Sequence, residues 1–155
     1  MSILNSVLKV FVGDKSKQDV KAILPIVNQI KSFESQLECL SHDELRAKTL
    51  EFKSKIADAR KSIEDQIIKL QEEADTTEDI DRKEDIYLEI DKLKDDSYNI
   101  TEETLNSILP EAFAVVKETA KRFVNNTEIK VKANAFDREV SGDNDYVTLE
   151  GFYLI

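Results

Sequence analysis

The chain has 155 residues, a net charge of −10 and 35% charged side chains, but only three glycines and two prolines. This composition favours long helices, and the length fits a single domain. The acidic balance disfavours binding to the phosphate backbone of nucleic acids.

The first twelve residues are amphipathic. Their apolar spacing predicts a short helix over residues 2–12 that Gly13 ends in a left-handed conformation. So short a helix needs a surface to dock on, and residues 1–31 carry five lysines against two aspartates. We expect the helix to fold onto its own domain or to meet an anionic membrane or a channel. The contact residues would be Ile3, Leu4, Val7, Leu8, Lys9 and Phe11.

A second apolar pattern predicts a helix over residues 17–39. Pro25 lies inside it, removes one backbone donor, and is expected to bend the helix or to end it. Residues 41–44 then form a capping box, in which the Ser41 hydroxyl and the Glu44 carboxylate each accept from the other's backbone amide. His42 lies inside this cap, where we expect it to be exposed.

Two further amphipathic helices are predicted over residues 43–73 and 80–96, joined by an acidic turn at 72–79. Such a pair packs as an antiparallel, coiled-coil-like hairpin. Residues 57–104 hold 17 acidic and 7 basic side chains, so the hairpin surface is acidic. Its expected seam consists of Leu45, Thr49, Phe52, Ile56, Ala59, Ile63, Gln66 and Leu70, opposite Ile80, Ile86, Tyr87, Ile90 and Leu93.

The next predicted helix covers residues 101–123, with Thr101 as its cap, Pro110 at a helix start and an end at residues 125–126. Its expected buried face consists of Ala112, Val116, Ala120 and Phe123. Alternating patterns at residues 129–133 and 146–149 predict a β-hairpin over 127–151. The fold class is therefore mainly α, in one domain over residues 1–155, with a small C-terminal β-hairpin.

No catalytic, cofactor or metal site is predicted. The glycines are not followed by Lys-Ser or Lys-Thr, so the pattern of a phosphate-binding loop is missing. The lone cysteine, Cys39, indicates a reducing setting and reads as a small core residue. His42 is three residues away, but nothing nearby orients its imidazole for nucleophilic catalysis. Asp143, Asn144 and Asp145 lack the spacing of a calcium loop and predict a turn.

Two stretches resemble the SecA family of bacterial preprotein translocase motors. They are residues 40–53, LSHDELRAKTLEFK, and residues 108–122, ILPEAFAVVKETAKR. The second is highly specific, because residues 109–116 keep the family's usual order. With the N-terminal helices, the resemblance covers residues 1–56 and 104–123. The acidic hairpin, an insertion over residues 57–100, resembles enlarged forms of a shorter family connection, and residues 151–155 match nothing in the family.

The resemblance implies the N-terminal region of an ATPase that pushes preproteins through a SecY-type channel, cytoplasmic and peripherally associated with the inner membrane. ATP and magnesium would bind the parent protein downstream, so this chain is expected to be neither an enzyme nor a cofactor carrier. Its expected partners are the channel and anionic membrane through the N-terminal helix, the rest of the motor, and a second copy. The alternative function is an independent acidic helical adaptor or chaperone-like module.

Overall fold

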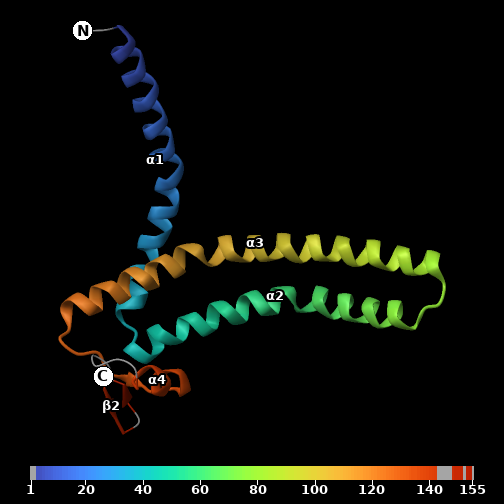
Figure 1. Cartoon of the computed structure of the whole chain (residues 1–155). Helices are drawn as coiled ribbons and strands as arrows, with labels where there is room; N and C mark the ends of the chain where they lie inside the picture. The colour runs from blue at the N-terminus through green and yellow to red at the C-terminus, as the bar shows by residue number, and fades with distance from the viewer. Residues whose placement is uncertain (1–2, 143–147, 152, 155) are drawn as a thin grey trace.

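The computed structural model describes the backbone of residues 3–142, 148–151 and 153–154, and their side chains except at 3–14, 16 and 154. Most of this part of the chain lies in three long helices, α1 (Ile3–Glu38), α2 (His42–Thr76) and α3 (Ile80–Asn125). Figure 1 shows α2 and α3 side by side and antiparallel, with α1 crossing their base and projecting away. The predicted mainly helical class is confirmed.

Capping residues in the local sequence fix where α2 and α3 begin. The predicted capping box is present, because the Glu44 amide donates to the Ser41 hydroxyl and the Ser41 amide donates to the Glu44 carboxylate at 2.7 Å. Asp79 caps α3 by accepting from the amides of Asp81 and Arg82. The loop at residues 77–79 is shorter than the predicted turn, because α2 continues to Thr76.

Several predicted helix boundaries are wrong. Gly13 lies inside α1, and Pro110 lies inside α3. Pro25 also lies inside α1, so of its two expected effects it does not end the helix. Thr101 is no cap: its hydroxyl donates to the carbonyl of Ser97 within the continuous helix. An interior glycine costs only about 1 kcal/mol relative to alanine, and a proline about 3 kcal/mol. Packing over the long helices offsets such local costs; Pro110 itself is buried.

The described core consists of two separate clusters. A base cluster joins the three helices through Leu37, Leu45 and Ala114, with Ile30, Phe33, Leu40 and Val115 against them. A tip cluster joins α2 and α3 through Ala74, Ile86 and Ile90, with Ile67 and Leu70 against them. Four of the expected seam residues are exposed and their prediction is wrong: Thr49, Gln66, Ile80 and Tyr87. The observed contacts use Ile67 in place of Gln66, because an apolar residue is available one position further along.

The face of α3 that is buried at the base differs from the predicted one. Val116 and Phe123 are 66% and 68% exposed, whereas Glu118 and Arg122 are each only 9% exposed. The helices α1 and α2 pack against the face that carries Ala114 and this ion pair. The prediction failed because it assumed that the more apolar face must be the covered one.

The C-terminal part is small and mixed. It contains β1 (Val131–Lys132), α4 (Ala135–Val140), β2 (Leu149–Glu150) and β3 (Tyr153–Leu154). The strands are antiparallel in the order β1-β3-β2, so β1 pairs with β3 and not with β2, which holds Leu149 of the predicted second strand. Gly151, at φ +62°, turns the chain between β2 and β3. The predicted turn residues Asp143, Asn144 and Asp145 lie outside the described residues.

Candidate functional site

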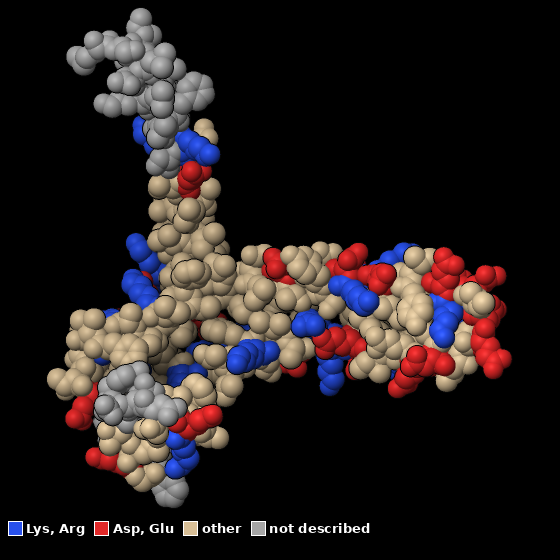
Figure 2. All heavy atoms as spheres, in the orientation of Figure 1, with Lys and Arg blue, Asp and Glu red and all other residues tan. Residues whose placement is uncertain are grey.

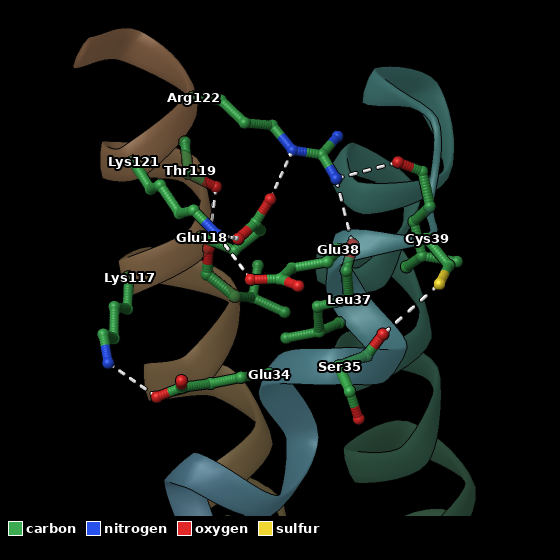
Figure 3. A network of polar contacts seen from close by, with 12 residues as sticks. Glu34, Ser35, Leu37, Glu38, Cys39, Lys117, Glu118, Thr119, Lys121 and Arg122 are labelled. Carbon is green, nitrogen blue, oxygen red and sulfur yellow. Dashed lines mark hydrogen bonds and ion pairs between the residues drawn. The ribbon is translucent and has the colours of Figure 1, made fainter. Parts of the chain in front are cut away.

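The three long helices meet at the side chain of Arg122. Its guanidinium donates from Nε to Glu118 Oε1 at 2.9 Å, and from Nη2 to the carbonyls of Leu37 at 2.9 Å and Leu40 at 2.8 Å (Figure 3). Its Nη1 lies 3.2 Å from His42 Nδ1. The carbonyls at the end of α1 have no partners within their own helix. Arg122 therefore ties the end of α1 and the start of α2 to α3.

Surface ion pairs extend the contact between α1 and α3. Lys117 Nζ lies 2.6 Å from Glu34 Oε1, and Lys121 pairs with Glu38 one turn further along (Figure 3). The hydrogen bond from Lys121 lowers the pKa of Glu38. These side chains are largely exposed, so solvent screens each pair, and the pairs serve mainly to fix the crossing of the helices.

A second group of charges joins α2 to α3 beyond the junction. Lys48 Nζ lies 2.8 Å from Glu111 Oε1 on α3 and 2.7 Å from Glu51 Oε2 on its own helix. Lys55 Nζ lies 2.8 Å from the other Glu51 oxygen. Hydrogen bonds from both lysines lower the pKa of Glu51 to about 2. The helices are thus linked by cations that each bridge two carboxylates.

The C-terminal part is pinned to α2 by Arg46 and Asp137. The guanidinium makes two parallel contacts with the carboxylate, at 2.7 Å to Oδ2 and 2.5 Å to Oδ1. Asp137 is 4% exposed, and the Arg46 hydrogen bond lowers its pKa. Asp137 also closes a capping box with Asn134, and Asp43 accepts from the amide of Lys132. The start of α2 thereby positions β1 and α4.

A cavity of about 820 Å³ opens beside the junction, between α2, α3 and the segment that leads into β1. Its walls combine the charged groups of Arg46 and Arg122 with apolar side chains such as Leu45 and Ile129. In the described part of the chain, no group of three or more His, Cys, Asp or Glu side chains is arranged to hold a metal ion. The cavity offers an apolar surface for packing, and its two arginines already pair with carboxylates of this chain, Arg46 with Asp137 and Arg122 with Glu118.

An apolar stripe runs along the outer side of α3 over its whole length. Its members recur at alternating spacings of seven and eleven residues, so every second one returns to the same side after 18 residues, or five helical turns. They are between 39% and 80% exposed. They are Ile80, Tyr87, Tyr98, Leu105, Val116 and Phe123. This stripe lies on a different side of α3 from the residues of both core clusters.

The helix α1 carries a further exposed apolar surface where it projects from the base (Figure 1). Val20, Ile23 and Leu24 are all more than half exposed. Among the described residues, no helix combines the length and the apolarity that crossing a bilayer requires. The predicted contact residues, Ile3, Leu4, Val7, Leu8, Lys9 and Phe11, belong to the backbone of α1, but their side chains lie outside the described part.

Two residues considered as a nucleophile pair have other surroundings than expected. Cys39 is exposed and its thiol donates to the carbonyl of Ser35, so its prediction as a core residue is wrong. His42 is half-buried, not exposed, and its Nδ1 faces Arg122.

Sequence periodicity did not identify the two residues that organise the junction. Glu118 and Arg122 are four residues apart on one helix, a spacing that ordinarily indicates an exposed ion pair. One signal was available: this pair lies inside the stretch over residues 108–122 that carries the family resemblance.

Comparisons with known proteins give one consistent result. A family model described as the SecA DEAD-like domain matches residues 8–137. The chain is 67% identical over 155 residues to the protein translocase subunit SecA of Christiangramia forsetii, and 54% identical over 151 residues to that of Flavobacterium psychrophilum. These matches cover 100% and 97% of the chain, but the chain spans only 14% of each relative. The first match includes residues 151–155, so the expectation that this segment matches nothing in the family is wrong. No solved structure matches it.

Proposed function

Because the chain belongs to the SecA DEAD-like domain family, we propose that it is the N-terminal scaffold and anchor of a protein-translocating ATPase. In this proposal the junction holds three helices in a fixed arrangement, and the remainder of the longer protein packs against them. The relatives are protein translocase subunits about seven times as long as this chain, which leaves ample polypeptide for that role.

The observation that carries the scaffold role is the exposed apolar face at the base of α3. Phe113, Val116 and Phe123 are all more than half exposed, and Phe123 also lines the cavity beside the junction. Contiguous apolar surface of this kind marks an interface. Since the chain spans 14% of its relatives, the natural occupant is the rest of the same polypeptide.

A chimeric translocase tests this role. This chain replaces the matching 155 residues of the Christiangramia forsetii relative, to which it is 67% identical. We expect the chimera to drive preprotein into inverted membrane vesicles, and the double variant Phe113→Ser/Val116→Ser to lose most of that activity. The matched control, Tyr98→Ser/Leu105→Ser, removes exposed apolar groups further out on the same stripe and should retain it. Equal activity of both double variants contradicts the scaffold role.

The anchoring role rests on α1. Its exposed apolar side chains lie beside Lys15, Lys17 and Lys21, which are also exposed. The stripe of Ile3, Leu4, Val7, Leu8 and Phe11 would extend the same helix toward its N-terminus. Each lysine near anionic lipid adds about 1 kcal/mol, whereas the acidic hairpin is repelled. We therefore propose weak, salt-sensitive, reversible association with an anionic membrane and with a SecY-type channel.

Vesicle co-sedimentation separates this role from docking of α1 on its own domain. The full chain and a chain that lacks residues 1–12 are compared on anionic and neutral vesicles at low and high salt. We expect only the full chain to sediment, only with anionic vesicles, and less at high salt. If both chains sediment equally with anionic vesicles at low salt, the first twelve residues are not an anchor.

We also propose that this chain holds no ATP site and catalyses no reaction by itself. The support is the sequence around its three glycines, where the Lys-Ser or Lys-Thr of a phosphate-binding loop is missing. ATP and magnesium would bind elsewhere in the longer protein. Titration with fluorescent ATP and magnesium should give no saturation, and saturable binding at micromolar concentration would contradict the proposal.

A further inference from the structure

The tip of the α2–α3 hairpin concentrates the negative charge of the chain. Residues 72–91 hold ten carboxylates and two cations, a net charge of −8. One cation, Arg82, already pairs with Glu73 across the loop at 2.6 Å. Figure 2 shows acidic side chains crowded at this far end, while the base of the molecule is mainly uncharged on this face. The tip therefore attracts cationic partners and repels anionic ones.

An exposed apolar patch lies within this acidic surface. Ile80, Tyr87 and Leu88 are 80%, 50% and 56% exposed on the outer side of α3. They line a shallow hollow of about 330 Å³ together with Lys83, Glu84 and Asp91. We call these six residues the tip patch. Large apolar side chains gathered in a strongly charged surface indicate an interaction surface more than a solvated one.

The tip patch is held rigidly from behind. Ile86 and Ile90 lie on another face of the same turns of α3, are 0% and 2% exposed, and pack with Ala74 of α2. This packing fixes the rotation of α3 about its axis and hence the direction in which the patch faces. A preformed surface loses little conformational entropy when a partner binds.

We propose that the tip patch is a docking surface for a basic amphipathic helix of a partner protein. The tip patch spans 12 residues of α3, from Ile80 to Asp91, or about 18 Å, which matches the length of a short helix laid alongside. Glu84 and Asp91 are placed to meet lysines or arginines that flank the partner's apolar stripe. A second copy of the tip would bring two charges of −8 together, so the occupant is not this same surface.

A designed peptide is the probe. It has 18 residues, all leucine or lysine, placed so that the leucines form one helical face; its control has the same composition in an order without a face. Each is labelled with fluorescein and titrated with the 155-residue chain at physiological salt. We expect the amphipathic peptide to bind about tenfold or more tightly than the control, because only it can cover the tip patch. Equal affinities would show general charge attraction and overturn the proposal.

Two matched double variants locate the binding. Tyr87→Ser/Leu88→Ser should weaken binding about tenfold, and Phe113→Ser/Val116→Ser, at the base of α3, should leave it unchanged. Glu84→Gln/Asp91→Asn should weaken binding more at low salt than at high salt. All six positions are on the surface, and circular dichroism verifies that the variants remain helical. The proposal is overturned if the base variant loses binding equally, or if sedimentation shows self-association that Tyr87→Ser/Leu88→Ser abolishes.

Discussion

The base and the tip of the molecule are both closed by small core clusters, but different forces set their geometry. At the tip, Ile86 and Ile90 pack against α2 in an apolar contact. At the base, Leu37 and Ala114 pack beside a buried ion pair that also satisfies the end of α1. Apolar contacts tolerate small shifts, whereas a guanidinium with several fixed acceptors demands one arrangement. The ion pair therefore fixes the relative positions of the three helices at the base, whereas apolar packing holds the tip together.

The largest effect should come from the base. Arg122→Ala leaves the buried Glu118 with only the 3.8 Å contact to Lys121, and it removes the guanidinium donor from the carbonyls of Leu37 and Leu40. We therefore expect a loss of about 4 kcal/mol in the free energy of unfolding by urea. The double variant Glu118→Leu/Arg122→Met removes both charges together. It should recover most of that loss, because a buried pair is worth little more than apolar packing. A loss below about 1 kcal/mol for Arg122→Ala would mean that the base needs no ion pair.

The tip should be destabilised when a buried side chain is shortened. Ile86 is fully buried, so Ile86→Ala should cost about 3 kcal/mol through lost burial and the cavity left behind. The control is Ile80→Ala on the exposed side of the same helix, which should stay within about 0.5 kcal/mol of the parent. Equal losses for both would show that the tip cluster is not a core.

The pin between Arg46 and Asp137 should depend on pH. The folded-state pKa of Asp137 lies below its ordinary 3.8, so its stabilisation is complete above that value and disappears as the pH falls through the folded-state pKa. At pH 7, Asp137→Asn should cost about 2 kcal/mol, because it loses charge-assisted hydrogen bonds. In urea titrations the difference from the parent should shrink below pH 3.8. A difference that stays constant with pH would contradict the pin.

The smallest effect should be at Glu51, between two lysines on α2. Its pKa is lowered from 4.5 to about 2, so its contribution is complete above pH 4.5 and is lost as the pH falls from there to about 2. Because Glu51 and Lys55 are more than a third exposed, solvent screens the interaction. Glu51→Gln should therefore cost only about 0.5 kcal/mol at pH 7. A cost above that of Asp137→Asn would reverse the ranking.

Each region was predictable in part. At the base, the capping box at Ser41 follows from local chemistry; at the tip, the buried pair Ile86 and Ile90 follows from apolar spacing, although Ile80 and Tyr87 of the same predicted run are exposed. The continuity of α3 was harder to predict. Pro110 and Thr101 commonly occur at helix boundaries, but here tertiary packing overrides that local preference. The partner strand of β1 could not be predicted either, because strand pairing depends on contacts between distant segments.

The face of α3 buried at the base could not be predicted from its own residues. Val116 and Phe123 form the more apolar side, yet α1 and α2 cover the side with Glu118 and Arg122. Sequence periodicity identifies the apolar faces of a helix such as α3, but it does not say which other segment covers each face. We propose that the rest of the longer polypeptide covers this open apolar face, because the chain spans only 14% of each relative.

The most direct test of the scaffold role measures whether that open face becomes covered. In a Cys39→Ser background, Val116→Cys is labelled with a maleimide in this chain alone and in the chimera with the Christiangramia forsetii relative, and Tyr98→Cys serves as the reference. We expect Val116→Cys to react quickly in the chain alone and about tenfold or more slowly in the chimera, while Tyr98→Cys reacts alike in both. Equal rates for Val116→Cys in the two proteins would show that the rest of the translocase does not pack against this face.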